Sequence, residues 1–374
     1  MSCYLCQGSE YAAILGGKST PIWNDAPDDH SLGVEMQCTL NQCLECGHVY
    51  QPVTNELRTT LRTIYNSEFA QGVSSMGIGS WGKSRAEALF FDHIDTNKYS
   101  SAMEIGCGDG YLLKRLKESG VKHLLGIEPS VNVSNSNDAI TIYNNFLDPK
   151  QELLESYDLI FSIAVLEHVE EIGPALEFCR NQLRACGDLF FVVPDCQPEL
   201  ESGDPALFTH QHIHYFTPDT IKALLEYHDL SATKLATLNN NLLVWATPKL
   251  GDSATKSRAV TYFHSYGEKL QTRLSMLEKY FVGENVLVHG ACNALNNIVA
   301  WTEGSFRLVD NDENKIGRKY GGRLVENPGT IDLESVKTIV VLPTSCFKEI
   351  SQQYKDMGFM GNIINTETVF GKLN

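Results

Sequence analysis

Length, composition and charge limit the classes of protein to which this chain can belong. Its 374 residues allow two or three domains, and eleven cysteines without an export signal favour thiols or metal ligands over disulfides. No apolar run approaches the ~18 residues of a membrane span, and the N-terminus lacks the pattern of a signal peptide. A net charge of −16 argues against a nucleic-acid-binding surface. We therefore expect a cytoplasmic protein that binds neither membrane nor nucleic acid.

The N-terminal segment contains two Cys-x2-Cys pairs, a spacing typical of metal sites. The four cysteines are Cys3, Cys6, Cys43 and Cys46. Four thiolates suit a tetrahedral Zn2+ and leave no open coordination position, so we expect a structural metal. Cys38, His30 and His48 are potential substitute ligands, and buried free thiols are the alternative interpretation.

A strand, a Gly-rich turn and a helix are predicted between Ser101 and Lys117. The turn reads E-I-G-C-G-D-G, with glycines at 106, 108 and 110. Glycine permits a tight turn and lets a ligand approach the backbone closely. The next strand ends at Glu128, about 20 residues further on, where an acid can bind a ribose diol.

Strands alternate with helices through the middle of the chain. A Gly-rich loop over 72–82, which is a hinge, a lid or a plain linker, lies between helices predicted at 56–70 and 83–94. Strands are expected at 102–105, 123–127, 141–143, 159–163, 189–193 and 242–247. This alternation predicts a parallel sheet covered on both faces, with ligands at the carboxyl ends of the strands.

Three histidines alternate after a proline-rich loop expected at 194–205. They are His210, His212 and His214, and Tyr215 follows them. In an extended segment alternate side chains share a face, which would suit an active-site wall, a metal site or simple loop hydrogen bonding. Histidine is readily tuned to accept a proton near neutral pH, so we favour the active-site wall. Thr217 and Pro218 predict the N-cap and first residue of the next helix.

A second, smaller α/β unit is expected after a linker over 248–257 and a helix over 261–281. A strand, a turn and a helix recur at 285–301, and Asp310 ends the next strand. The incomplete glycine pattern at 289–291 leaves open whether this turn is a nucleotide half-site. The predicted domains are a zinc-binding domain over 1–70, a core over 71–250 and a C-terminal Rossmann-like α/β domain over 251–374.

The core resembles a class I S-adenosylmethionine-dependent methyltransferase. The E-x-G-C-G-x-G turn, the acid after the second strand and Y-D-L-I-F-S-x-A-V-L-E-H-V after the fourth recur in that family in this order. The resemblance implies a Rossmann-like fold that binds S-adenosyl-L-methionine, with the adenine near Asn145, which is equally well explained as a turn residue. The implied cofactor-binding residues are Glu104, Gly106, Gly108, Gly110, Glu128, Asn145, Phe146 and Ala164.

The whole chain resembles the nucleotide-linked keto-sugar C-methyltransferases, which join a zinc-binding domain, a methyltransferase core and a C-terminal α/β domain. In the last domain, G-A-C-N-A-L-N-N and L-V-D-N-D-E-N-K-I-G-R-K-Y-G-G are similar to motifs of that family. The resemblance implies a 4-keto sugar on a nucleotide diphosphate, which loses the proton beside its ketone and takes a methyl group on carbon. It implies His212 as the base and Tyr215 as a second site residue, and we expect His210 or His214 to assist. The oligomeric state stays open, and a monomer is compatible with the sequence.

The chain departs from that family's Y-x-E-H-x-x-Y-F pattern at two positions. His212, Tyr215 and Phe216 match, but Thr209 replaces the tyrosine and Gln211 the glutamate. An amide cannot orient and polarise a histidine as a carboxylate does. Methyl transfer to oxygen or nitrogen of a sugar or related small molecule is therefore a second hypothesis, and a binding protein without turnover is a third.

Overall fold

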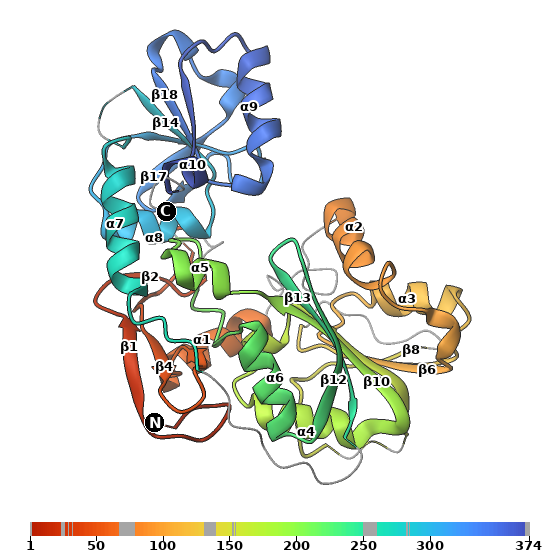
Figure 1. Ribbon diagram of the computed structural model, residues 1–374. Coiled ribbons are helices and arrows are strands. Elements are labelled where there is room, and N and C mark those ends of the chain that lie inside the picture. Colours follow the sequence, from red (N-terminus) through yellow and green to blue (C-terminus); the bar gives the residue numbers. More distant parts are fainter. Residues whose placement is uncertain are drawn as a thin grey trace. The chain divides into compact units, whose positions relative to one another are not determined.

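The computed structural model of the chain contains two compact units (Figure 1). The described residues are 2–23, 27–28, 30–31, 33–66, 79–130, 140–151, 153, 155–249, 260–281, 283 and 285–370. The first unit contains residues 1–12, 40–197 and 212–262, and the second contains 13–39, 198–211 and 263–374. Each unit thus combines stretches that lie far apart in the sequence.

A seven-stranded sheet of order β12-β13-β10-β9-β6-β7-β8 forms the centre of the first unit (Figure 1). The strands are β6 (Ser101–Ile105), β7 (His123–Ile127), β8 (Ile140–Tyr143), β9 (Tyr157–Ile163), β10 (Leu183–Pro194), β12 (Leu230–Leu238) and β13 (Asn241–Pro248). The strands from β10 to β8 run parallel, as predicted, whereas β13 pairs antiparallel with both β10 and β12. The sequence analysis did not find β12, whose side chains are mostly polar or small and partly exposed.

Alternate side chains of this sheet enter two separate cores, as the two-residue period of a strand requires. In β9, Ile160 enters the core formed with α4 and α6, and Phe161 enters the core formed with α2 and α3 (Figure 1). Phe161 packs against Phe90, with 4.4 Å between ring centroids. The covering helices are α2 (Gly79–Phe90), α3 (Tyr111–Glu118), α4 (Ile172–Gln182) and α6 (Pro218–Tyr227). The prediction of a sheet covered on both faces is therefore confirmed.

Local capping explains where several helices begin. Thr217 caps α6 and accepts a hydrogen bond from the amide of Thr220, with Pro218 in the first turn as predicted. The expected loop at 194–205 is wrong in part, because it contains α5 (Gln197–Ser202), whose start is fixed by a 3.2 Å hydrogen bond from the Gln197 amide to Asp195. Helix α1 spans Asn55–Tyr65.

Several predictions fall partly outside the described residues. Positions 72–78 of the expected Gly-rich loop, 67–70 of the helix before it and 250–257 of the expected linker all lie there. Helix α2 begins at Gly79, inside the predicted loop.

A small four-stranded sheet of order β1-β4-β5-β11 carries the cysteine pairs. Its strands are β1 (Tyr11–Leu15), β4 (Leu40–Cys43), β5 (Val49–Tyr50) and β11 (His214–Tyr215). Strand β11 pairs antiparallel with β5, so that His214 lies opposite Tyr50. The histidine segment is therefore attached to the strand that follows the second cysteine pair.

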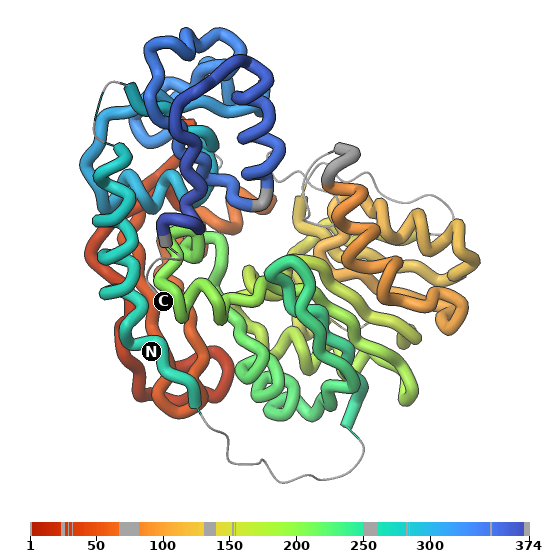
Figure 2. Tube along the Cα trace, turned by 45° about the horizontal axis from the view of Figure 1, so that its top comes forward, coloured from red at the N-terminus to blue at the C-terminus, as the bar shows by residue number. Residues whose placement is uncertain are grey.

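The second unit contains a six-stranded sheet of order β16-β17-β15-β14-β18-β19. Its strands are β14 (Val286–His289), β15 (Arg307–Val309), β16 (Lys319–Tyr320), β17 (Arg323–Glu326), β18 (Thr338–Val341) and β19 (Asn362–Asn365), and its helices are α7 (Tyr266–Glu278), α8 (Asn293–Trp301), α9 (Phe347–Asp356) and α10 (Thr366–Phe370). All neighbours except β16 and β17 run parallel, which confirms a second α/β sheet. The hairpin of β2 (Ser19–Pro21) and β3 (Glu35–Gln37) belongs to this unit, and β2 packs beside α8 (Figure 2).

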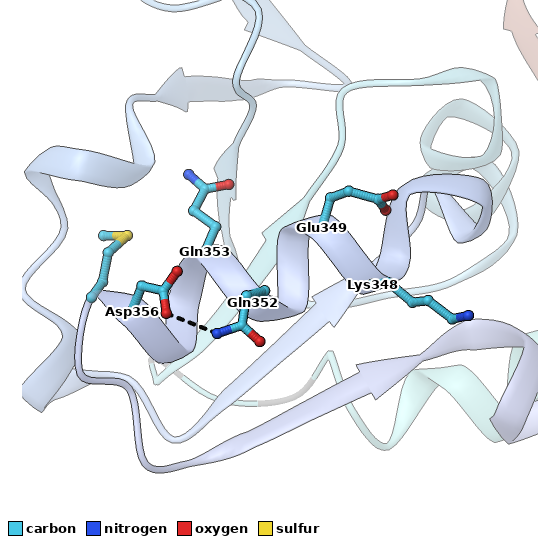
Figure 3. Close-up of a pocket in the computed structure, with 6 residues that line it drawn as sticks. Lys348, Glu349, Gln352, Gln353 and Asp356 are labelled. Carbon is cyan, nitrogen blue, oxygen red and sulfur yellow. Dashed lines mark hydrogen bonds between the residues drawn. The ribbon is translucent and has the colours of Figure 1, made fainter.

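The surface of α9 holds a shallow depression in this unit (Figure 3). Its polar side chains project from the helix, and Gln352 donates a 2.8 Å hydrogen bond to Asp356 one turn later. None of the predicted site residues lies there. No helix in the described ranges combines the length and the apolar character that spanning a bilayer requires.

Candidate active site

The Gly-rich turn lies at the carboxyl edge of the core sheet, where the strand order reverses between β6 and β9. This is where open α/β sheets bind ligands. Gly106, Gly108 and Gly110 have φ angles of 73°, 51° and 72°, a left-handed backbone that favours glycine. A Cβ atom on Gly106 would collide with the side chain of Val165. The turn thus requires glycine for both its backbone conformation and its packing.

Glu128, at the end of β7, fixes this turn with its carboxylate. Its Oε2 accepts a hydrogen bond from the Gly108 amide at 2.9 Å, and its Oε1 accepts one from the Ser130 amide at 3.0 Å. Burial raises the pKa of Glu128, and the two amide hydrogen bonds oppose that shift. Each oxygen retains a lone pair, so the carboxylate can also accept the hydroxyls of a ribose. Glu104, earlier in the site, is fully buried in β6.

Ala164 directly follows β9 at the same edge of the sheet. Its φ of 53° is uncommon for a residue with a side chain, and such backbone conformations gather at functional sites. Its amide donates a 2.8 Å hydrogen bond to the carbonyl of Val192 in the adjacent strand, which holds this conformation. The residues at the ends of β6, β7 and β9 thus lie together at one edge of the core sheet, and their binding of S-adenosylmethionine stays a prediction.

The residues predicted to contact the adenine lie after the edge strand β8. Asn145 is exposed, and its amide donates to the carbonyl of Tyr143 at 2.9 Å, which is a turn contact. Phe146 is half-buried beneath the guanidinium of Arg62, 4.5 Å from the ring centroid. Their role in cofactor binding stays a prediction.

The expected common face of three histidines is not formed, because the backbone turns at His210 and Gln211. Nε2 of His210 hydrogen-bonds the carbonyl of Met36 at 3.0 Å. Nε2 of His214 donates to the carbonyl of Val169 at 2.8 Å. Burial lowers the pKa of both histidines to about 4, so each is neutral at physiological pH. These contacts argue against a shared metal site, and catalytic assistance from His210 stays a prediction.

His48 belongs to the histidine segment and not to the cysteine cluster. Its Nε2 lies 3.0 Å from Nδ1 of His214. Because His214 donates through Nε2, its Nδ1 must accept, so His48 donates across this contact. Burial lowers the pKa of His48 well below its usual range. The pair joins the strand after the second cysteine pair to the segment that carries His212.

His212 lies beside two residues to which the sequence analysis gave no role, Glu167 and His168. They form the end of a short 3-10 helix, Leu166–His168, that follows β9. A carboxylate oxygen of Glu167 and one ring nitrogen of each histidine all lie within 4.8 Å of one another. The two histidine rings are 4.9 Å apart between centroids and inclined at 71°. The L-E-H-V stretch in the sequence was the signal for this cluster.

The surroundings of the cluster set its protonation. Glu167 is 1% exposed, and its Oε2 has no hydrogen-bond partner. Burial raises the pKa of Glu167 to about 8. Burial, and then the neighbouring His168, lower the pKa of His212 well below its usual range. At neutral pH the cluster therefore pairs a buried carboxylic acid with a neutral imidazole, and the fully buried Tyr215 has its ring centroid 6.1 Å from that of His212.

The four predicted cysteines converge on one point in the first unit. Sγ atoms lie 3.7 Å apart for Cys3 and Cys46 and 3.5 Å apart for Cys6 and Cys43, and all four lie within 4.8 Å of one another. A tetrahedron with Zn–S bonds of about 2.3 Å has edges of about 3.8 Å, so the cluster fits Zn2+. Cys38 lies elsewhere, 3.3 Å from the hydroxyl of Thr20.

Comparison with known proteins defines the class of the core. The family model described as "Methyltransferase domain" matches residues 81–235. These residues form a class I S-adenosylmethionine-dependent methyltransferase domain.

A stretch of 106 residues is 31% identical to the tRNA U34 carboxymethyltransferase of Shewanella baltica, covering 26% of this chain and 32% of that protein. The chain thus spans about a third of the length of the curated relatives it matches.

Solved structures with similar folds include S-adenosylmethionine-dependent methyltransferases from Mesorhizobium loti and Clostridium acetobutylicum. The first has 16% identity and a TM-score of 0.36 over 46% of this chain and 98% of its own. The second has 10% identity and a TM-score of 0.34 over 45% and 97%.

Substitution of Gly106 tests cofactor binding at the Gly-rich turn. We expect Gly106→Ala to weaken S-adenosylmethionine binding at least about tenfold, because the new methyl group collides with Val165 and strains the turn. Gly120→Ala is the matched control, since Gly120 also has a positive φ, 98°, but has open space around its Cβ position. Titration calorimetry measures the affinity, and equal binding by both variants would contradict the assignment.

Loss of the cysteine cluster should remove the metal and disturb the histidine segment. We expect the double variant Cys43→Ser, Cys46→Ser to lose about one Zn2+ per chain by elemental analysis. Its melting temperature should fall, because β5 follows Cys46 directly and pairs with β11. Cys186→Ser, which removes an exposed cysteine, should retain both the metal and the stability. Undiminished zinc in the double variant would contradict a four-cysteine site.

The raised pKa of Glu167 predicts the pH dependence of stability. Unfolded Glu167 loses its proton near the ordinary value of 4.5, whereas the folded chain retains it up to about 8, so the folded state binds more protons in this range. The free energy of unfolding of the natural protein should therefore fall relative to Glu167→Gln by about 1.4 kcal/mol per pH unit between roughly 5 and 8. Denaturant unfolding of both proteins from pH 5 to 9 measures this difference. A difference that does not change with pH would contradict it.

Proposed function

We propose that the protein transfers the methyl group of S-adenosylmethionine to a sugar linked to a nucleotide diphosphate, at a carbon beside a ketone. The observation that carries this proposal is His212, a neutral imidazole at the end of the core sheet that bears the Gly-rich turn. Neutral imidazole is the form that can accept a proton. When bound, S-adenosylmethionine supplies an electrophilic methyl group on a sulfonium.

In this proposal the role of His212 is to remove the proton beside the ketone. The C–H bond breaks, its electron pair forms the enolate and the proton moves to a ring nitrogen of His212. The enolate carbon then takes the methyl group, and the electron pair of the broken S–C bond stays on sulfur. An enolate oxygen needs a donor or a fixed dipole. Tyr215 is the residue that we assign to assist, since its ring centroid lies 6.1 Å from that of His212.

The sugar substrate is supported by the domain composition of the chain. A four-cysteine cluster that fits zinc, a methyltransferase domain and a second parallel α/β sheet occur together in one chain. The keto-sugar C-methyltransferases combine the same three parts. The net charge of −16 argues against a tRNA substrate, which a Shewanella relative modifies.

Thr209 and Gln211 favour a second candidate, transfer to a sugar hydroxyl or amine. Transfer to oxygen forms no enolate. It therefore needs no hydrogen-bond donor to an enolate oxygen, so the tyrosine that Thr209 replaces is not required. His212 would still act there as the base for a hydroxyl.

Proton exchange in D2O tests carbon transfer. We expect the protein to exchange the α-proton of a nucleotide-linked 4-keto sugar without any cofactor present, as measured by proton NMR over a panel of such sugars. His212→Ala should slow exchange at least about 100-fold, because general-base catalysis contributes that much. His123→Ala, which alters an exposed histidine of β7, should leave the rate unchanged.

The absence of exchange in the natural protein would rule out carbon transfer to these sugars. Methylation of a hydroxyl or amine, detected by mass spectrometry with S-adenosylmethionine, would then support the second candidate.

A further inference from the structure

We infer that Glu167 positions the catalytic base His212. It supplies the carboxylate that position 211, a glutamine in this chain, cannot provide. This inference rests on the proposed function and adds a residue that the sequence pattern does not assign. A histidine base gains from a carboxylate that orients it and stabilises its protonated form. The pattern places that acid directly before His212, where this chain has an amide.

Two observations support this position for the Glu167 side chain. One carboxylate oxygen lies within 4.8 Å of a ring nitrogen of His212 and of one in His168. The Oε2 atom of Glu167 is buried without a hydrogen-bond partner. Buried carboxylate oxygens without partners are rare because desolvation is unfavourable. A function requiring a proton acceptor explains why such a carboxyl group is kept beside two imidazoles.

The backbone of Glu167 also holds the segment that it would serve. Its carbonyl accepts the Ile213 amide at 2.8 Å, so the residue after His212 is tied directly to Glu167. From the other side, Nε2 of Gln51 donates to the carbonyl of His212 at 3.0 Å. Glu167 and His212 therefore lie at a fixed separation although they are far apart in the sequence.

The third member, His168, is oriented by α1. Its Nδ1 lies 3.0 Å from the hydroxyl of Tyr65, which leaves Nε2 to face Glu167 at 3.8 Å. The next acid along the chain, Glu170, is neutralised by Arg58 in a 2.6 Å ion pair. Among the described residues, the titratable groups that face the Glu167 carboxyl are His168 and His212, with Tyr65 behind His168.

The proton balance follows from this arrangement. With Glu167 ionised, proton transfer from the substrate carbon to His212 turns a carboxylate–imidazole pair into a carboxylate–imidazolium pair of zero net charge. With Glu167 protonated, or replaced by glutamine, the same transfer leaves a buried net positive charge. Buried uncompensated charge is strongly unfavourable. We therefore expect the rate to rise as Glu167 ionises and the rise to disappear in Glu167→Gln.

The experiment measures α-proton exchange and methyl transfer from pH 6 to 9 for the natural protein, Glu167→Gln, Glu167→Asp and Glu171→Gln. Glutamine should lower both rates at least about 100-fold and remove the rise with pH, while leaving S-adenosylmethionine affinity within about twofold. Aspartate should restore part of the rate. Glu171→Gln alters an exposed acid of the same segment and should match the natural protein.

Each other outcome overturns the inference. Exchange by the natural protein, with an unchanged rate and pH profile in Glu167→Gln, would leave the proposed function intact and show that Glu167 is only a packing residue. Activity that EDTA abolishes and Mn2+ restores, with Mn2+ binding lost in Glu167→Gln, would make Glu167 a metal ligand. No exchange by the natural protein would remove the proposed function and this inference together.

Discussion

The candidate site depends on hydrogen bonds that hold the segment from His212 to Tyr215 between β5 of the small sheet and the short helical turn that follows β9. On one side, β11 pairs with β5, and the Gln51 amide donates to the carbonyl of Ile213 at 2.8 Å. On the other side, the carbonyls of Glu167 and Val169 accept from this segment. Buried backbone groups must be paired, so the segment cannot shift without breaking several contacts. The second cysteine pair lies at the connection between β4 and β5, so it is close in the chain to the strand with which β11 pairs.

Two glutamates at the carboxyl edge of the core sheet illustrate how environment divides roles between identical side chains. Glu128 accepts two backbone amides, one on each oxygen, and these favour its ionised form. Glu167 is also buried but has an oxygen without a donor, and burial raises its pKa to about 8. The first carboxylate is suited to a permanent structural and ligand-binding charge. The second carboxyl group is suited to gaining and losing a proton near neutral pH. In many active sites different environments likewise separate the pKa values of two carboxyl groups.

The contacts of Glu128 recur in the second unit. Asp310, after β15, accepts the Ala291 amide at 2.8 Å and the Asp312 amide at 2.9 Å, just as Glu128 accepts the Gly108 and Ser130 amides. In both sheets an acid at the end of one strand locks the turn that follows its neighbour. Locking that turn is thus a structural role for the acid in both units, and nucleotide binding in the second unit stays a prediction.

Much of the architecture followed from local signals in the sequence. The apolar segment at 123–127 was predicted as a strand with the bounds that β7 has, and the other core strands were predicted with shorter bounds than observed. The Thr217–Pro218 pair marked the start of α6, and glycines occupy the left-handed positions of the Gly-rich turn. These features depend on backbone conformation and on apolar burial within a few residues. Strand β12 was not predicted because half-exposed polar strands lack a clear hydrophobic pattern.

The amino-acid sequence by itself determined the methyltransferase core and the four converging cysteines. The tertiary structure alone decided which histidine meets a carboxylate. Three alternate histidines share one face only where the backbone is extended. The backbone turns at His210, so the three side chains do not share a face. The role that we propose for Glu167 depends on its burial and on its position near His212. Both arise because segments far apart in the sequence pair and pack together. Local sequence patterns do not predict such long-range pairing, because it depends on how distant segments pack in the folded chain.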